Sequence, residues 1–273
     1  MEIKFIKMNA SGNDFIVIDN RKKVMGSNAG ALARHLCVRK KSVGADGLLL
    51  IGDSKVADFT MDIYNPDGSR AQMCGNGSRC AAMFAFEERI CKSNMKIETL
   101  AGVLEASVKG GRVRVKLPDP HGLKLNLKIG TGGTGQEVSF INTGVPHTVV
   151  FVKNVDKVKV EEKGRALRYN AAFKPAGTNV DFVSVKGASS VYVRTYERGV
   201  EAETLSCGTG SVASAIISGI KYGLKPPVKV FTRGGEVLGV DFSSRGKKEP
   251  RGVYLEGPAE LVYRGVLNGR KRR

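Results

Sequence analysis

Cys74-Gly-Asn-Gly-Ser78 and Cys207-Gly-Thr-Gly-Ser211 are two copies of one short motif, in opposite halves of the 273-residue chain. Each copy follows a strand-like run and opens a helix-like run. The pattern predicts a thiol at the start of each of two helices, where unpaired backbone N–H groups and the helix dipole favour negative charge. We expect this setting to lower the pKa of both cysteines. Two such thiols at equivalent positions of the two motifs indicate an acid and a base that act on opposite faces of one carbon atom.

The similarity between the two halves extends beyond the cysteines. Tyr64-Asn65 and Tyr196-Glu197 each end a strand-like run upstream of a motif. Further upstream, Gly12-Asn13-Asp14-Phe15 aligns with Gly177-Thr178-Asn179-Val180-Asp181-Phe182. Three landmarks in the same order predict a diverged duplication with two related lobes. Chance similarity between Gly-rich turns is the alternative.

Strand signals dominate the chain, as short β-branched or alternating runs bounded by Gly, Asn or Asp. They cover residues 3–8, 15–19, 48–51, 59–64, 96–99, 104–108, 112–116, 138–142, 148–152, 180–185, 191–196, 228–232, 253–255 and 259–263. Helical patterns cover 29–37, 77–90 and 210–222, and the last is apolar on nearly every side, which is typical of a buried helix. Residues 130–135 fit G-x-G-x-x-G but precede a strand pattern, so we predict a hairpin loop there.

The clearest interruption of the chain is Pro118-Asp119-Pro120. We therefore expect an N-terminal lobe over residues 1–117, a C-terminal lobe over 118–255 and a basic tail over 269–273. A strand at about 256–268 is a candidate to complete the first lobe. The expected fold class is α/β (α+β), with two pseudo-symmetric lobes that each wrap a strand-rich sheet or barrel around a central helix.

Composition narrows the classes of function. The formal net charge is +18, yet the basic residues are spread along the chain and there is no Trp, so we interpret the charge as a basic surface rather than a nucleic-acid site. An RNA-binding protein remains an alternative that rests on charge alone. No apolar run reaches the roughly 20 residues of a membrane helix. Five unevenly spaced cysteines favour a reducing, cytoplasmic location over a disulfide framework.

Six motifs together resemble the signature set of the diaminopimelate epimerase family. They are Ser11-Gly-Asn13-Asp-Phe15, Asn65-Pro-Asp-Gly68, Met73-Cys74-Gly-Asn76-Gly, Gly144-Val-Pro146-His147, Tyr196-Glu197-Arg198-Gly199 and Cys207-Gly-Thr209-Gly. The resemblance implies a cofactor-independent, metal-free epimerase that interconverts LL- and meso-diaminopimelate in lysine and peptidoglycan-precursor synthesis. It also implies an active site in the cleft between the two lobes.

Site residues follow from the resemblance, position by position. It makes Cys74 and Cys207 the catalytic thiols, with His147 and Glu197 in support. The substrate's reacting carboxylate would be held by Gly75, Asn76, Gly208 and Thr209, and its other polar groups by Asn13, Asn65, Asn179, Glu197 and Arg198. The remaining cysteines, Cys37, Cys80 and Cys91, are expected to be inert small hydrophobic residues.

Two positions depart from the family pattern. Val145 stands where many members have Asn, and Gly47 where some have Gln, so recognition of the distal group could use fewer side chains. Two alternative functions stay open at this point. One is a proline-racemase-type enzyme, which we expect to have His in place of Asn76, and the other is redox signalling through the cysteine pair. Assembly as a homodimer is also left open.

Overall fold

The computed structural model describes residues 2–23, 28–131, 134–243 and 250–268. The chain divides into two compact units. Unit 1 is Met1–Val115 with Gly257–Arg273, of which the described part begins at Glu2 and ends at Asn268, and unit 2 is Lys116–Glu256. The expected basic tail, 269–273, lies outside the described residues.

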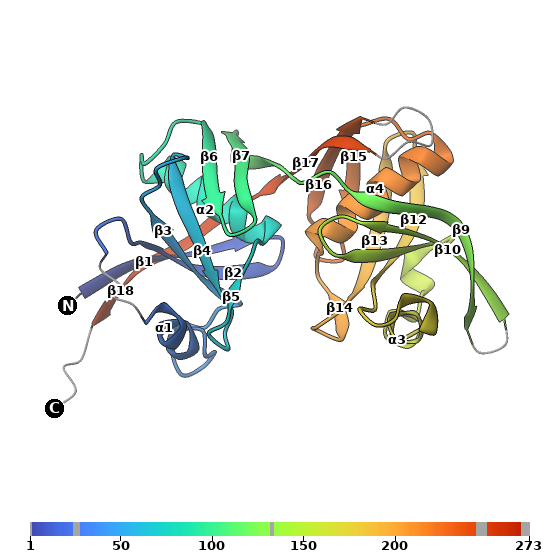
Figure 1. Cartoon of the computed structure of the whole chain (residues 1–273), viewed down its shortest axis with the longest axis horizontal. Coiled ribbons are helices and arrows are strands. Elements are labelled where there is room, and N and C mark those ends of the chain that lie inside the picture. Colours follow the sequence, from blue (N-terminus) through green and yellow to red (C-terminus); the bar gives the residue numbers. More distant parts are fainter. Residues whose placement is uncertain (1, 24–27, 132–133, 244–249, 269–273) are drawn as a thin grey trace. The chain divides into compact units, whose positions relative to one another are not determined.

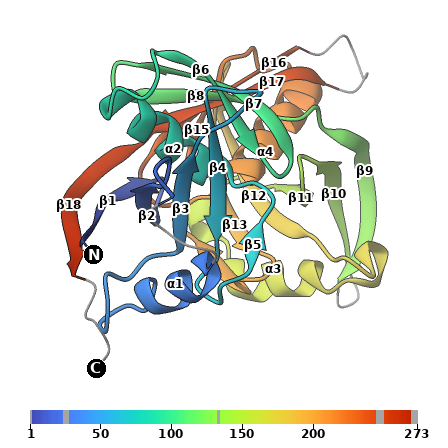
Figure 2. The same ribbon diagram turned by 60° about the vertical axis from the view of Figure 1, so that its left-hand side comes forward.

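Unit 1 holds a strand-rich sheet and two helices (Figure 1). Its elements are β1 (Glu2–Ala10), β2 (Asn13–Asp19), α1 (Ala29–Leu36), β3 (Gly47–Gly52), β4 (Phe59–Tyr64), β5 (Arg70–Ala71), α2 (Gly75–Glu87), β6 (Asn94–Thr99), β7 (Gly102–Lys109), β8 (Arg112–Lys116) and β18 (Glu260–Asn268). The final strand, β18, pairs antiparallel with β1, so the two ends of the described chain lie side by side (Figures 1 and 2).

Unit 2 has the same construction. Its elements are β9 (His121–Thr131), β10 (Thr134–Asn142), β11 (Pro146–Phe151), the 3₁₀ turns η1 (Val155–Lys157) and η2 (Ala171–Phe173), α3 (Val160–Arg168), β12 (Asn179–Gly187), β13 (Ser190–Glu197), β14 (Ala202–Thr204), α4 (Gly208–Tyr222), β15 (Val228–Phe231), β16 (Val237–Ser243) and β17 (Arg251–Pro258). β9 and β10 pair antiparallel around the predicted hairpin loop, of which residues 132–133 are not described.

Strand pairing repeats from one unit to the other. In unit 1, β2–β3 and β4–β6 are parallel, and β3–β4 and β6–β7 are antiparallel. In unit 2, β11–β12 and β13–β15 are parallel, and β12–β13 and β15–β16 are antiparallel. The predicted fold class, with two pseudo-symmetric lobes around central helices, is therefore confirmed.

One of the three sequence landmarks was aligned wrongly. Asn13 begins β2, whereas Asn179 begins β12, and the pairing pattern makes β12 the counterpart of β3. Short turns rich in Gly and Asn look alike in sequence because they satisfy the same backbone geometry. The duplication therefore depends on the two cysteine motifs and on the strand order.

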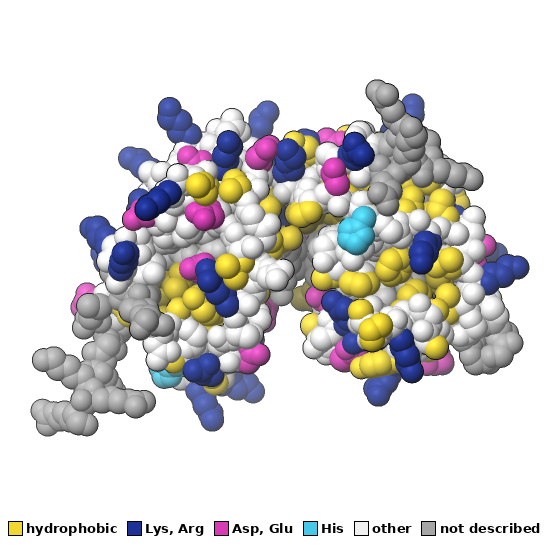
Figure 3. All heavy atoms as spheres, in the orientation of Figure 1, with side chains coloured by type: hydrophobic (Ala, Val, Ile, Leu, Met, Phe, Trp, Pro, Cys, Tyr) yellow, Lys and Arg dark blue, Asp and Glu magenta, His cyan; other side chains and the backbone are white. Residues whose placement is uncertain are grey.

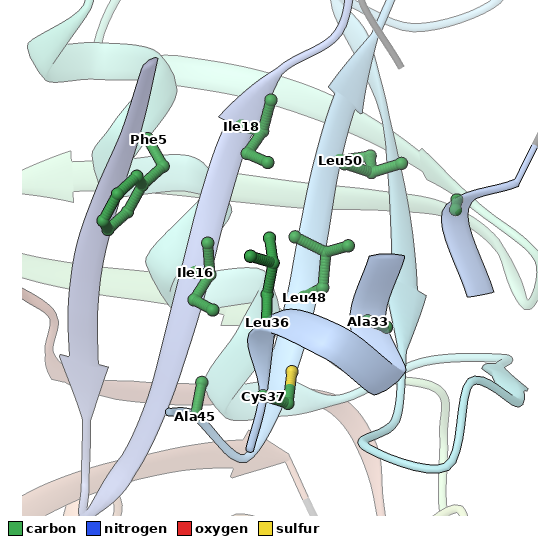
Figure 4. Close-up of a cluster of buried hydrophobic side chains, with 10 residues drawn as sticks. Phe5, Ile16, Ile18, Ala33, Leu36, Cys37, Ala45, Leu48 and Leu50 are labelled. Carbon is green, nitrogen blue, oxygen red and sulfur yellow. The ribbon is translucent and has the colours of Figure 1, made fainter. Parts of the chain in front are cut away.

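The central strand β3 of unit 1 is covered on both faces. Strand β3 is a continuous apolar run from Leu48 to Ile51, and all four side chains are buried. Leu48 of β3 lies on the same face of the sheet as Ile16 of β2, and it packs against Leu36 of α1 (Figure 4). Helix α2 packs against β2 and β3 as well. Such continuous apolar strands are typical of parallel pairs covered on both sides.

The central helices are buried as expected. Residues Gly210 to Ser218 of α4 are all buried, and α4 packs against β11, β12, β13, β15 and β16 of its own unit. In α2 the buried stretch runs from Asn76 to Ala85. The start of each central helix is therefore fixed by core packing, and the cysteine that precedes it is fixed with it.

Candidate active site

Cys74 is the N-cap residue of α2. Its backbone is extended (φ −143°, ψ 122°), and its Sγ accepts a hydrogen bond from the backbone N–H of Gly77 at 3.4 Å. Serine and aspartate oxygens fill this role at most helix starts. A sulfur acceptor here lies at the positive end of the helix dipole, beside the backbone N–H groups of Gly75 and Asn76.

Asn76 is held by a buried network in unit 1. Its Nδ2 donates to Asn13 Oδ1 at 2.6 Å, and its Oδ1 accepts from Arg79 Nη2 at 2.6 Å. The Arg79 side chain is fully buried and also donates to Ser11 Oγ at 2.7 Å. Asn13 Nδ2 donates in turn to Asp46 Oδ2 at 3.1 Å. Two predicted substrate contacts, Asn13 and Asn76, are thus brought together with fixed orientations.

Charged groups stabilise the Asn13 end of this network. Arg39 donates to both Asp14 and Asp46, and Lys7 Nζ lies 2.8 Å from Asp14 Oδ2. Burial by itself raises the pKa of Asp14, but the hydrogen bonds and charges of Arg39 and Lys7 outweigh it and lower that pKa to about 2. The loop around Asn13 is therefore tied to charged partners at neutral pH.

Asn65 lies in a different setting. It is exposed after β4, and its Nδ2 donates to Ser69 Oγ at 2.9 Å within a tight turn. Backbone hydrogen bonds between Asn65 and residues Gly68 and Ser69 close the turn. Its amide is thus used in turn geometry, and a role in substrate binding stays a prediction.

Cys207 is the N-cap residue of α4, also with extended backbone (φ −124°, ψ 114°). Its side chain is buried, and its Sγ lies 3.4 Å from Thr209 Oγ1. Thr209 Oγ1 lies 2.9 Å from His147 Nε2. His147 Nδ1 lies 2.7 Å from Asp181 Oδ2, and Thr195 Oγ1 donates to Asp181 Oδ1 at 2.7 Å. A continuous chain of polar contacts therefore leads from the thiol to a buried carboxylate.

Gly210 has no side chain, and this leaves room for the chain of polar contacts between Cys207 and Asp181. A methyl group on Gly210 would lie 2.3 Å from Asp181 Oδ1 and 3.2 Å from His147 Cε1. Real Cβ atoms do not approach an oxygen so closely, so a side chain at this position would displace the carboxylate. The glycine of the second motif thus serves packing of α4 onto β11 and β12.

Asn179 and Arg198 form the outer part of the site in unit 2. Asn179 Oδ1 accepts from the backbone N–H of Arg198 at 2.7 Å, and its Nδ2 donates to Pro146 O at 3.1 Å and lies 3.4 Å from His147 Nε2. Arg198 Nη1 donates to Ala176 O at 3.0 Å. Structure in unit 2 therefore brings Asn179, His147, Thr209 and Cys207 together, as the predicted site requires.

The expectation that the pKa of Cys207 is lowered was wrong. Burial raises the pKa of this thiol well above its ordinary value, and the charges of Glu197 and Asp181 raise it further. The Thr209 hydroxyl and the Gly210 amide act in the opposite direction but do not outweigh burial. Burial also raises the pKa of Glu197, against the opposing effects of the Thr204 hydroxyl and His147. Cys207 is therefore a thiol at neutral pH.

Sequence reasoning missed several residues of these networks, chiefly Asp181, Thr195 and Arg79. Asp181 had a signal: it is an acidic residue inside the apolar strand Asn179–Gly187, on the same face as Asn179. Arg79 had one too, as a charged residue in the middle of a buried helix. Thr195 has no signal of its own, because a threonine in a strand is ordinary.

In residues 2–23, 28–131, 134–243 and 250–268, no group of three His, Cys, Asp or Glu side chains is placed to hold a metal ion. Within the same ranges, no helix combines the length and apolar character needed to cross a membrane.

Comparison with known proteins identifies the family. The family model for diaminopimelate epimerase matches residues 5–119 and 139–262. Diaminopimelate epimerase of Aquifex aeolicus is 47% identical, over 97% of this chain and 98% of the relative, and that of Methanothrix thermoacetophila is 41% identical, over 98% and 96%.

Solved structures share the fold at low sequence identity. A phenazine biosynthesis protein of the PhzF family from Bacillus anthracis has a TM-score of 0.72 at 17% identity, covering 98% of this chain and 99% of that one. A hydroxyproline epimerase from Agrobacterium vitis has a TM-score of 0.70 at 16% identity, covering 97% and 92%. These likenesses show a common two-lobed fold, and the sequence matches decide between its families: this chain belongs to the diaminopimelate epimerase family.

Proposed function

We propose that this protein interconverts LL- and meso-diaminopimelate by proton removal and return at one α-carbon, without a cofactor. The observation that carries the proposal is the pair of cysteine N-caps, Cys74 on α2 and Cys207 on α4, in a chain of this family. The reaction is an isomerisation that serves lysine and peptidoglycan-precursor synthesis.

The chemistry needs a base on one face of the carbon and an acid on the other. Cys207 is buried and protonated, so we assign it as the acid of the free enzyme and Cys74 as the base. After one turnover the two thiols have exchanged roles, which suits a reversible reaction. Glu197 and His147 support Cys207, Glu197 through its charge and His147 through Thr209.

Removal of an α-proton leaves negative charge on the substrate carboxylate. The helix starts at Gly75-Asn76 and Gly208-Thr209 present backbone N–H groups and the positive ends of two helix dipoles. Such groups are oriented before reaction, so they stabilise the developing charge without reorganisation. We assign these four residues to the reacting carboxylate.

The substrate's distal ammonium and carboxylate need donors and acceptors. Asn13, Asn65 and Asn179 carry amides that supply both, Glu197 is an acceptor when ionised, and Arg198 grips a carboxylate with two parallel hydrogen bonds. Gly47 contributes no side chain, and a Cβ there would lie 3.2 Å from Tyr64 O and 3.3 Å from the Phe15 ring. Distal recognition therefore rests on the amides and on Glu197 and Arg198.

Alternative functions are less well supported. Asn76 stands where a proline-racemase-type enzyme is expected to have His, and its amide is fixed by Asn13 and Arg79. RNA binding rested on net charge, and Figure 3 shows Lys and Arg side chains scattered over the visible face rather than gathered in a stripe. Redox signalling through Cys74 and Cys207 rests on the repeated cysteine motif alone.

Assembly and location are part of the proposal. We propose a homodimer, because apolar side chains on β18 are exposed: Leu261, Val262, Tyr263 and Val266, at 37%, 56%, 43% and 49%. Sedimentation at several concentrations tests this, and a strictly monomeric enzyme would contradict it. We place the enzyme in the cytoplasm, because five unevenly spaced cysteines suit a reducing compartment better than a disulfide framework.

Solvent-deuterium incorporation at the α-carbon tests the reaction. Purified protein incubated with LL-diaminopimelate in D₂O should produce the meso isomer with deuterium at the inverted carbon. Proline and glutamate serve as control substrates. Deuterium exchange into proline with none into diaminopimelate would favour the racemase alternative.

A further inference from the structure

Unit 2 contains a cavity of about 490 Å³ that the proposed function does not use. Its floor is a row of side chains on three neighbouring strands, in which Ser184 of β12 pairs with Tyr192 of β13 and Tyr192 pairs with Phe231 of β15. Ser184 lies two positions after Phe182, which packs against α3, so the cavity opens on the α3 face of the sheet. Asp181 and the polar chain to the thiol lie on the opposite face. Cavities of this volume are typical of sites for small molecules.

Four cationic side chains line the cavity, and one of them is held over its floor. The four are Lys153, Lys186, Arg194 and Arg233. Lys186 Nζ donates to the Tyr192 hydroxyl, and it lies 4.5 Å from the centre of the Tyr192 ring and 4.9 Å from that of Phe231. Aromatic faces attract a cation without cancelling its charge. The two rings therefore position this ammonium group and leave its charge to act on an anion in the cavity.

Glu203 of β14 neutralises one of the two arginines. Arg194 Nε donates to Glu203 Oε1 and Arg194 Nη2 to Glu203 Oε2, each at 2.6 Å, which is a bidentate pair. Arg194 Nη1 also donates to Val155 O at 2.9 Å and to Val158 O at 3.2 Å, so this side chain is used to hold η1 and β14. Arg233 Nε lies further from Glu203 Oε1, at 3.8 Å, and its side chain is 57% exposed. Arg233 is therefore oriented beside the cavity with its donors directed to solvent or to a ligand.

The charges around the cavity do not balance. With Arg194 paired to Glu203, three cations remain: Lys153, Lys186 and Arg233. Among the described residues that line the cavity, the one carboxylate is Asp156. Three cations less one carboxylate leave a surplus of two positive charges. A phosphate monoester carries about −1.5 to −2 charges at pH 7, whereas a carboxylate carries a single negative charge. The surplus therefore matches a phosphate better than a carboxylate.

We propose that this cavity is a second ligand site, which binds a phosphate monoester of a small polar molecule. The three cations that Glu203 does not neutralise hold the phosphate. The cavity is larger than a phosphate group, and the rest of its lining suits a hydroxylated body such as a sugar. That part of the lining consists of the hydroxyls of Ser184 and Thr232 and the amide of Asn154. The inference goes beyond the proposed function, because the site lies across the sheet from the proposed catalytic thiol.

The test is the binding of ribose 5-phosphate to the full chain, measured by isothermal titration calorimetry. Inorganic phosphate and ribose are the comparison probes, because the first lacks the organic body and the second lacks the charge. We expect saturable binding of one ribose 5-phosphate per chain. Inorganic phosphate should bind at least about 10-fold more weakly, and ribose should not bind, because the charge-assisted hydrogen bonds to phosphate supply most of the affinity.

Two double variants separate the site from the basic surface as a whole. Lys186→Gln with Arg233→Gln removes two of the three cations, and both side chains are exposed, so we expect the fold to persist. Lys92→Gln with Lys109→Gln is the matched control, because these exposed lysines of unit 1 lower the net charge by the same amount. The dissociation constant for ribose 5-phosphate should rise at least about 10-fold in the first variant and stay unchanged in the second.

Urea unfolding verifies that both variants are folded. Absence of saturable binding to the wild type, equal affinity for inorganic phosphate, or equal weakening in the two double variants would overturn the site. If the wild type does not act on diaminopimelate but ribose 5-phosphate binds as expected, the proposed function fails and the second site stands.

Discussion

Substitution of Gly210 by alanine should damage both stability and catalysis. In a helix interior, alanine is more favourable than glycine by about 1 kcal/mol. At this position that gain is overridden, because the new methyl would lie 2.3 Å from Asp181 Oδ1. Asp181 cannot turn away without losing the hydrogen bonds to His147 and Thr195.

The magnitude follows from these contacts. Overpacking of a core costs about 1–3 kcal/mol, and loss of a buried hydrogen bond that leaves a polar group without a partner costs about 1–3 kcal/mol. Partial relaxation of α4 shares the two costs, so with the helix gain subtracted we expect a net loss of about 2–4 kcal/mol. Displacement of His147 should also reduce epimerisation, because the ring no longer reaches Thr209 Oγ1.

Gly77→Ala is the matched control, since Gly77 holds the same position in the first motif. A methyl there would meet Cys74 Cβ and Leu49 Cδ2 at 3.4 Å, which is ordinary contact. This variant should be as stable as the wild type, or more stable by up to about 1 kcal/mol. Urea unfolding followed by circular dichroism measures both. A Gly210→Ala protein that unfolds at the wild-type urea concentration would refute the packing argument.

Three further predictions concern the thiols. Cys74→Ala and Cys207→Ala should each reduce epimerisation at least about 10²-fold, while Cys80→Ala and Cys91→Ala retain most of it; near-wild-type turnover by either of the first pair contradicts the two-base assignment. Chelator-treated protein without pyridoxal phosphate should still exchange the α-proton, and activity that returns only with added pyridoxal phosphate would disprove cofactor independence. Burial raises the pKa of Cys37 from its ordinary value of 9.0 to about 11, so the unfolded state loses this proton first and the free energy of unfolding falls between these pH values. The full loss for Cys37 is about 3 kcal/mol, and the pH dependence of urea unfolding should be flatter in Cys37→Ala; an unchanged slope would show that other groups cause it.

The positions proposed to be catalytic were readable from the sequence because their signals are local. A cysteine followed by Gly-x-Gly-Ser at the start of an apolar helix pattern predicts an N-cap, and Cys74 and Cys207 occupy those positions. What the thiols do was not readable. The pKa of Cys207 depends on burial and on Glu197 and Asp181, which other strands bring to it.

Helix α3 was not predicted, because its sequence mixes charged residues with a glycine and has no clear apolar pattern. Helix α3 is largely charged and has Gly164 in its middle, which lowers its intrinsic helix propensity. In the structure a Cβ on Gly164 would lie 2.4 Å from Tyr196 Cβ, so the glycine permits close packing of α3 on β13. The residue that requires a glycine at position 164 is Tyr196, which lies on another element 32 positions further along the chain.

The sequence by itself determined the two cysteine N-caps, the strand-rich two-lobed class and most of the strands, because backbone propensity and apolar periodicity act over a few residues. Only the tertiary structure decided that β18 pairs with β1, that β12 is the counterpart of β3, and that Asp181, His147 and Thr209 connect to Cys207. Strand pairing and buried hydrogen bonds join residues far apart in the chain, and their energies depend on which groups the fold removes from water together.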